Sequence, residues 1–210
     1  MLIANPTFAS PSLLSREGAL NLLEPYLEIL NQCIDGGWSA WKKDYAHKSH
    51  ILDARSRAAI VYAEIFHRAL QSFQGLPRVK VLLRPGSLMI YIGEEVTLRF
   101  KKMRRSGRCS NIRTVIQRRF LAQLQLPGML DGTLVHAGYE LDDLQQNVVR
   151  KAVVCQLGKD VLWDIEITGA SAELVSMPPV EPAGQPTVQP RFVAKGSQTD
   201  QPAASIEKRG

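Results

Sequence analysis

The chain has 210 residues, and its 26 Lys and Arg against 20 Asp and Glu give a formal net charge of +6. Hydrophobic residues make up 45% and charged residues 22%, which is ordinary for a globular protein that builds its own core. No apolar run of about 18 residues predicts a transmembrane helix, and the N-terminal residues show no secretory signal. We therefore expect no membrane contact and a cytoplasmic location.

A first helix is predicted to follow Ser15, a candidate N-cap, because apolar residues then recur at alternating spacings of three and four. Pro25 either kinks this helix or starts a new one, and the pair Gly36-Gly37 is expected to end it. Its apolar stripe consists of Leu20, Leu23, Leu27, Leu30 and Ile34.

A second helix is predicted to begin at Asp53 or Ser56 and to stop at Gly75 and Pro77. Two helices with apolar stripes are expected to pack on each other or on a sheet. The stripe of the second helix consists of Ala59, Tyr62, Phe66, Ala69 and Phe73.

From residue 79 onward apolar and polar residues alternate, which is typical of strands. Residues 79–83, 88–92 and 96–101 predict a three-stranded antiparallel meander with short turns. In the third of these strands Phe100 is expected to point inward, while Arg99 and Lys101 leave the opposite face.

Residues 110–125 return to helical spacing, with an apolar side formed by Ile112, Ile116, Phe120 and Leu124. A strand is predicted at 134–139, and a hairpin is predicted at 148–157 and 161–167. One face of the last strand is expected to carry Val161, Trp163, Ile165 and Ile167.

These elements predict an α+β fold, with N-terminal helices packed on an antiparallel sheet of about six strands and one further helix between two β segments. We expect residues 1–10 to be flexible and residues 11–168 to form a single domain. Half of the 12 prolines fall within residues 171–210, where few apolar side chains could offset the entropy of ordering. Residues 169–210 are therefore predicted to be a disordered, Pro-rich tail.

Several large side chains are candidates for the core. Phe66 and Trp163 each lie on the apolar stripe of a predicted element. Trp38 and Trp41 lie three residues apart and cover one surface, which favours packing in the core over an aromatic ligand-binding site. His136 lies on a predicted strand and is expected to point away from the core face.

The cysteines and histidines predict no metal site. Cys33, Cys109 and Cys155 form no CxxC pair and lie in no cluster at ligand spacing, so we expect reduced thiols. His47 and His50 are three residues apart, but a third ligand is missing nearby in the sequence. GxGxxG, Walker A, GxSxG and HExxH motifs are also absent, and no cofactor is predicted.

The strongest functional signal is the segment 99–119, which contains nine basic residues and no acid. Because the whole chain carries only +6, the remainder is slightly negative. We expect one positive surface that binds nucleic-acid phosphates or an acidic protein partner, the alternative being a solvated loop and helix face. The basic residues are Arg99, Lys101, Lys102, Arg104, Arg105, Arg108, Arg113, Arg118 and Arg119.

Weak candidates for catalysis lie on the second predicted helix. Glu64 and His67 are neighbours at i,i+3, where a general acid and base could meet, and Arg57 lies on the same helix. With the basic segment they would make a small enzyme that cleaves phosphodiesters. His67 is equally explained as a structural side chain at a helix edge.

The central part of the chain carries a further signal in Arg99-Phe-Lys-Lys102, Ser110-Asn-Ile-Arg-Thr114, Gln117, Leu126-Pro-Gly128, Gly138-Tyr139 and Trp163. Over roughly residues 55–167 it resembles a poorly characterised bacterial family that accompanies regulatory or toxin–antitoxin-like genes of mobile elements. The resemblance implies an accessory or regulatory protein and supplies no active-site residues.

The sequence favours a non-enzymatic bacterial binding or regulatory protein that engages nucleic acid or an acidic protein partner. A phosphodiester-cleaving enzyme is the alternative from another class. A structural subunit whose helices pair with a second chain is the third hypothesis.

Overall fold

The structure is a computed structural model that describes residues 13–84, 86–109, 114–124 and 132–169, all within one compact unit. The predicted flexible N-terminus and the predicted tail beyond residue 169 lie outside these ranges. The elements in chain order are α1 (Arg16–Asp44), a short 3-10 helix (Ala46–Lys48), α2 (Ala54–Phe73), β1 (Val79–Arg84), β2 (Ser87–Ile92), β3 (Val96–Lys102), α3 (Val115–Leu121), β4 (Thr133–Leu141), β5 (Val148–Leu157) and β6 (Asp160–Glu166).

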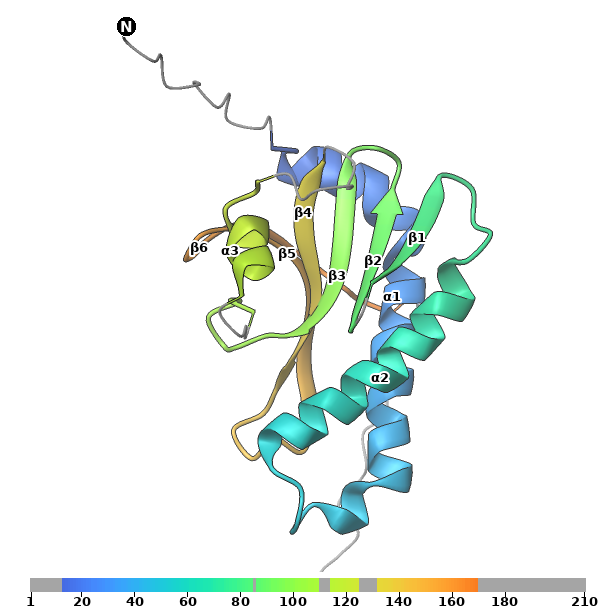
Figure 1. Ribbon diagram of the computed structural model, residues 1–210, viewed down its shortest axis with the longest axis vertical. Coiled ribbons are helices and arrows are strands. Elements are labelled where there is room, and N and C mark those ends of the chain that lie inside the picture. Colours follow the sequence, from blue (N-terminus) through green and yellow to red (C-terminus); the bar gives the residue numbers. More distant parts are fainter. Residues whose placement is uncertain (1–12, 85, 110–113, 125–131, 170–210) are drawn as a thin grey trace, which may run out of the picture. The chain divides into compact units, whose positions relative to one another are not determined.

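The six strands form one sheet in the order β1-β2-β3-β4-β5-β6, so the predicted α+β class is confirmed (Figure 1). The meander and the C-terminal hairpin are antiparallel, as predicted. β3 and β4, however, run parallel, so the sheet is mixed and the expectation of an antiparallel sheet is wrong at this junction. The physical reason is α3, whose segment serves as the crossover that a parallel connection requires.

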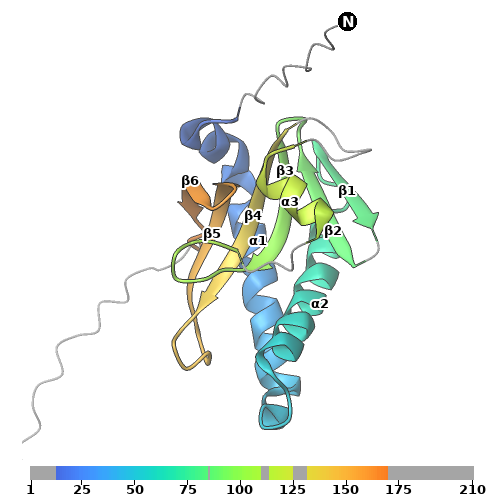
Figure 2. The ribbon, with the colours of Figure 1, turned by 60° about the vertical axis from the view of Figure 1, so that its left-hand side comes forward.

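The sheet is covered on both faces (Figures 1 and 2). α1 contacts β4, β5 and β6, while α2 contacts β1, β2 and β3, and together they bury the main core. α3 lies on the other face, where Phe120 packs with Met89, Tyr91 and Leu134. None of the helices in the described ranges has both the length and the apolar character needed to cross a bilayer.

α1 is longer than predicted, because Gly36 and Gly37 do not end it. Ser15 caps the helix by accepting a hydrogen bond from the Gly18 N–H, and the helix continues through Pro25 to Asp44. Gly37 packs directly against α2: a Cβ there would lie 2.5 Å from Ile65 Cγ1 and 3.2 Å from the Ile65 backbone N. The glycine therefore serves helix–helix packing rather than helix termination.

The extended α1 buries Trp38 and Trp41, so both tryptophans are core residues as expected. α2 begins after Asp53, which accepts a hydrogen bond from the Ser56 N–H, and this N-cap prediction is confirmed. Ala69 and Phe73 of the predicted stripe are buried, but earlier in the helix the buried residues are Val61 and Ile65 instead of Tyr62 and Phe66.

Phe66 and Trp163 were expected in the core, but both are only partly buried at its edge. Trp163 keeps one side toward solvent and its indole Nε1 donates to the Leu14 carbonyl at 2.9 Å. A bulge between Cys155 and Gln156 shifts the β5–β6 register and places Val161 with the cluster on the α3 face. The four predicted apolar residues of β6 therefore do not share one face.

α3 is shorter than the predicted helix. Phe120 is buried as expected, whereas Ile116 and Leu124 are 49% and 42% exposed, so the predicted apolar side is wrong for these two residues. Ile112 lies outside the described residues. The helix is too short to bury a full stripe, and the polar residues Gln117 within it and Gln123 just after it are buried instead.

Candidate functional site

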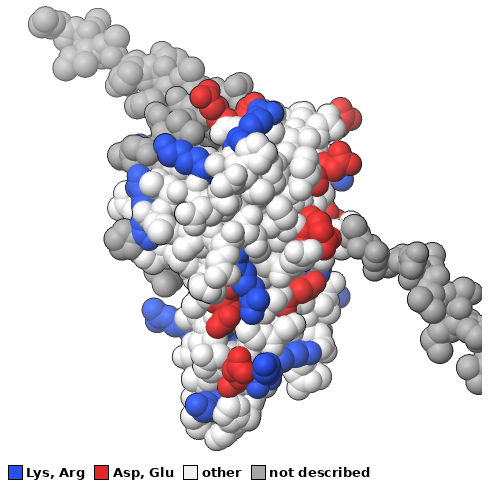
Figure 3. Space-filling view, turned by 90° about the vertical axis from the view of Figure 1, so that its right-hand side faces the viewer, with Lys and Arg blue, Asp and Glu red and all other residues white. Residues whose placement is uncertain are grey.

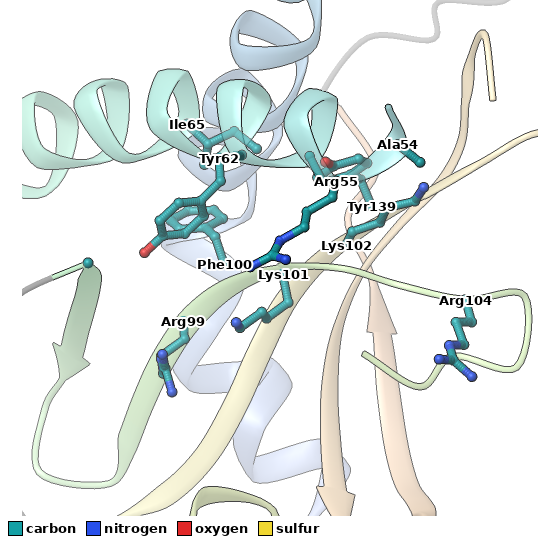
Figure 4. A pocket seen from close by; sticks show the side chains of 13 residues that line it. Ala54, Arg55, Tyr62, Ile65, Arg99, Phe100, Lys101, Lys102, Arg104 and Tyr139 are labelled. Atoms are coloured by element: carbon teal, nitrogen blue, oxygen red, sulfur yellow. The ribbon is translucent and has the colours of Figure 1, made fainter. Parts of the chain in front are cut away.

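A cleft opens where β2 and β3 separate. β1 pairs with β2 over six residues and β3 pairs with β4 over seven, but β2 meets β3 only at Ile90–Ile92 opposite Val96–Leu98. Beyond Leu98, β3 therefore has a described strand neighbour only on its β4 side. A cleft of about 610 Å³ lies at this position, beneath the N-terminal half of α2 (Figure 4).

Four consecutive residues of β3 line the cleft, from Arg99 to Lys102. Neighbouring side chains of a strand point to opposite faces, so a cleft that touches all four lies along the strand edge rather than on one face. Figure 4 shows Arg99 and Lys101 leaving one side of β3 while Arg55 reaches toward the strand from α2. The remaining lining residues are Ala54, Ala58, Ala59, Tyr62, Ile65, Gly86, Arg104 and Tyr139.

Tyr62 marks the place where the two strands part. Its hydroxyl accepts a hydrogen bond from the backbone N–H of Leu88 at 3.2 Å. This contact satisfies a β2 donor that has no described partner in β3. The hydroxyl thus gives the backbone N–H of Leu88 a partner at the point where β2 leaves β3.

The cleft is strongly basic. Five of its lining residues are cationic and none is acidic, the five being Arg55, Arg99, Lys101, Lys102 and Arg104. Burial lowers the pKa of Arg99 and of Lys101, and the positive charge of Arg99 lowers the pKa of Lys101 further. Burial also lowers the pKa of Lys102, with a second contribution from Arg57. Among the described residues no carboxylate forms an ion pair with Arg99, Lys101 or Lys102.

Neutral groups orient two of these cations. The Arg99 guanidinium lies 5.2 Å from the centre of the Phe120 ring and donates to Gln117 Oε1 at 3.4 Å. Lys102 Nζ donates to Gln145 Oε1 at 3.2 Å, and the Arg57 guanidinium donates to the same oxygen. These contacts fix the side chains but leave their charges uncompensated, which is the arrangement an anion would complete.

The structure brings together only part of the predicted basic surface. Arg99, Lys101, Lys102 and Arg104 line the cleft. Arg105 lines an adjoining hollow of about 280 Å³, whose basic residues are balanced by Glu140, Asp142 and Asp143. Arg108, Arg118 and Arg119 are exposed and line neither hollow, and Arg113 lies outside the described residues.

Arg55 was not among the predicted binding residues. A usable signal does exist in the sequence, because Arg55, Ala58, Ala59 and Tyr62 share one face of α2 at helical spacing. Two alanines between a cation and an aromatic residue leave space beside the helix. That space becomes a site only because the strand edge of β3 lies opposite.

The weak catalytic candidates are not brought together. Arg57 donates to Gln145, Glu64 pairs with Arg68 at 3.8 Å, and His67 is exposed. None of the three lines the cleft. The proposed pair of Glu64 and His67 therefore does not lie beside the basic residues of the cleft.

His136 lies on the face opposite the main core, as predicted, but α3 covers it completely. Its ring centre lies 4.7 Å from that of Phe120, and neither ring nitrogen has a hydrogen-bond partner among the described residues. Burial lowers the pKa of His136 to about 3, helped by the positive charges of Arg99 and Lys101. Histidine at this position is therefore neutral near pH 7.

The described residues contain no group of three or more His, Cys, Asp or Glu arranged to hold a metal ion. His47 and His50 are exposed, and the three cysteines are buried and form no disulfide bond. No family model matches the chain, and comparisons with curated proteins and solved structures find no significant match.

Proposed function

We propose that this chain is a nucleic-acid-binding protein that holds the phosphate backbone in the cleft between α2 and β3. The observation that carries the proposal is the desolvated state of Arg99, Lys101 and Lys102, which lack a carboxylate partner among the described residues. Withdrawing a charge from water costs free energy unless another charge compensates it. A bound phosphate supplies that compensation.

Two further features favour phosphate over a lone carboxylate. Three of the five cations are arginines, whose planar guanidinium presents several donors to phosphate oxygens. Arg99 and Lys101 are two residues apart on one face of a strand, which spaces them by about 6.6 Å. Such spacing suits successive groups along a polyanion better than a single acidic side chain.

We place this binding in a bacterial accessory or regulatory role without catalysis, in line with the resemblance of the central segment. A phosphodiester-cleaving enzyme has less support, because Arg57, Glu64 and His67 face different neighbours. An acidic protein segment remains the alternative occupant of the same cations.

Fluorescence anisotropy of a labelled oligonucleotide at several salt concentrations tests the proposal. If all five cations of the cleft contact phosphates, the log–log salt slope is about −3.5 to −4.5. The double variant Lys101→Ala/Lys102→Ala should flatten this slope by about 1.5 units. The matched control is Lys48→Ala/Lys159→Ala, which removes the same charge at exposed positions outside the cleft and should bind like the wild type.

Two outcomes contradict the proposal. Absence of binding by the wild type at about 50 mM salt excludes nucleic acid at useful affinity. Equal weakening in both double variants means that only net charge matters and that the cleft is not the site. In either case, a pull-down of protein partners in the presence of polyglutamate would test the alternative that an acidic protein segment binds the same cations.

A further inference from the structure

The cleft has two chemically different sides. Its cations come from the first turn of α2, from β3 and from the loop after β3, whereas the rest of α2 contributes Ala58, Ala59, Tyr62 and Ile65. Phe100 and Tyr139 extend the apolar side toward the core. A ligand that fills the cleft must therefore carry negative charge and an apolar surface close together.

Duplex nucleic acid does not meet this requirement. Its phosphates are exposed, but the flat faces of its bases are stacked inside the helix, out of reach of Tyr62. An unpaired nucleotide presents its phosphate and the face of its base at once, and proteins that bind single strands use both. The volume of about 610 Å³ is within the range of small-ligand pockets and has room for a base.

The edge of β3 adds hydrogen-bonding groups at the same place. The Met103 N–H donates to the Tyr139 carbonyl on the β4 side at 2.8 Å. Because the peptide groups of a strand alternate in direction, those of Phe100 and Lys102 face the cleft, where no described strand pairs with them. An N–H donor and a carbonyl acceptor on a strand edge match the donors and acceptors on the edge of a base.

We infer that the cleft accommodates one unstacked base of a single-stranded nucleic acid, with the base against Tyr62, its edge at the backbone of Phe100 and Lys102, and flanking phosphates at the cations. The inference rests on the proposed function and specifies its substrate class. It also assigns Tyr62 two separate roles, since the ring contacts the base while the hydroxyl caps Leu88.

The test compares three labelled oligomers of equal length: a single strand, the same strand with several abasic sites, and a duplex. The wild type should bind the single strand about tenfold or more tightly than the other two, the scale of one base–aromatic stack. Tyr62→Ala should abolish this preference while leaving the salt slope unchanged. Tyr62→Phe, which keeps the ring and loses only the hydroxyl, should retain the preference.

A second variant allows the same test if Tyr62→Ala does not fold. Ala59 is an exposed α2 residue that lines the cleft, so Ala59→Leu fills the space without changing charge or helix propensity greatly. In Ala59→Leu, the affinity for the single strand should fall to the value measured for the abasic strand. The affinity for the abasic strand should be the same as in the wild type. Circular dichroism of each variant confirms the fold.

The outcomes separate the inference from the proposed function. Equal affinity for single strand and duplex, or for intact and abasic strands, overturns base insertion but leaves phosphate binding in place. A preference that survives both Tyr62→Ala and Ala59→Leu also overturns it, because the base would then bind elsewhere. If none of the three oligomers binds, the proposed function itself fails.

Discussion

The chemistry of single residues in this protein depends on their surroundings as well as on their type. His136 is buried with two unpaired ring nitrogens and sits opposite Arg99 in the β3–β4 register. The folded chain keeps this side chain neutral down to about pH 3, whereas an unfolded histidine takes up a proton near pH 6.5. Folding and protonation of His136 therefore oppose each other in acid.

The first prediction concerns the pH dependence of stability. Below about pH 6.5 the unfolded state binds a proton at His136 that the folded state does not, so the free energy of unfolding falls as the pH falls toward about 3. Between about pH 7.5 and about pH 5, denaturant titration should show about 2 kcal/mol of loss from this residue. His136→Leu should lack that contribution, while His47→Leu, at an exposed position, should keep it.

At the scale of elements, α3 depends on its attachment to the sheet. A helix of 7 residues is marginal by itself, so tertiary contacts must hold it. Gln123, just after α3, donates to the carbonyls of Leu134 and Gln156 and accepts from the Leu134 N–H, each at 2.8 Å. α3 in turn orients Arg99 in the cleft.

The second prediction follows from this attachment. Gln123→Leu leaves three buried backbone groups without partners and should lower the free energy of unfolding by about 3 kcal/mol or more. Hydrogen exchange should also show faster opening of α3 than in the wild type. The matched control is Gln32→Leu on α1, which changes the same type of side chain at an exposed site and should be nearly neutral.

The packing of α1 against α2 at Gly36 and Gly37 is the second feature at the scale of elements. Alanine forms helix better than glycine by about 1 kcal/mol, so both Gly36→Ala and Gly37→Ala would stabilise an isolated helix. In the protein a Cβ at Gly37 meets Ile65 Cγ1 at 2.5 Å and the Ile65 backbone N at 3.2 Å. A Cβ at Gly36 meets the Arg68 side chain, which can move aside.

The third prediction is therefore that Gly36→Ala and Gly37→Ala differ in the sign of their effect on the free energy of unfolding. Gly37→Ala should lower the free energy of unfolding by about 1–3 kcal/mol, the cost of overpacking a helix contact. Gly36→Ala should be neutral or stabilising by up to about 1 kcal/mol. Thermal unfolding of the two variants decides this, and stabilisation by both would mean that the helices do not cross at Gly37.

At the scale of the whole molecule, the cleft differs in charge from the face shown in Figure 3. On the face shown in Figure 3 basic and acidic side chains are interspersed. The cleft instead gathers five cations with no acid in its lining. A concentrated positive site favours one mode of binding over general adhesion to polyanions.

The fourth prediction concerns the chain beyond residue 169. Every buried apolar residue of the described core lies at or before Ile167. Removing residues 170–210 should therefore change the free energy of unfolding by less than about 2 kcal/mol, the scale of one large buried side chain. This segment carries four acids and four bases, so the salt slope of oligonucleotide binding should also be unchanged. A larger loss of stability would show that the segment packs on the core.

Much of the fold followed from local signals. Ser15 and Asp53 each place a side-chain oxygen where the first free N–H groups of a helix need an acceptor, so both helix starts were predictable. The alternation at residues 79–102 likewise predicted three strands, because one face of each must be buried. Four residues of the cleft, Arg99, Lys101, Lys102 and Arg104, were found from their clustering in the sequence.

What the sequence by itself determined about this protein is the set of helices and strands, the α+β class and the concentration of charge near β3, since caps, periodicity and charge runs act over a few residues. Only the tertiary structure decided that Gly37 packs against α2, that β3 and β4 run parallel and that Arg55 joins the cleft. Each of these depends on a partner distant in the chain. The cleft itself exists because β2 and β3 part after Leu98, and no local pattern records where two paired strands separate.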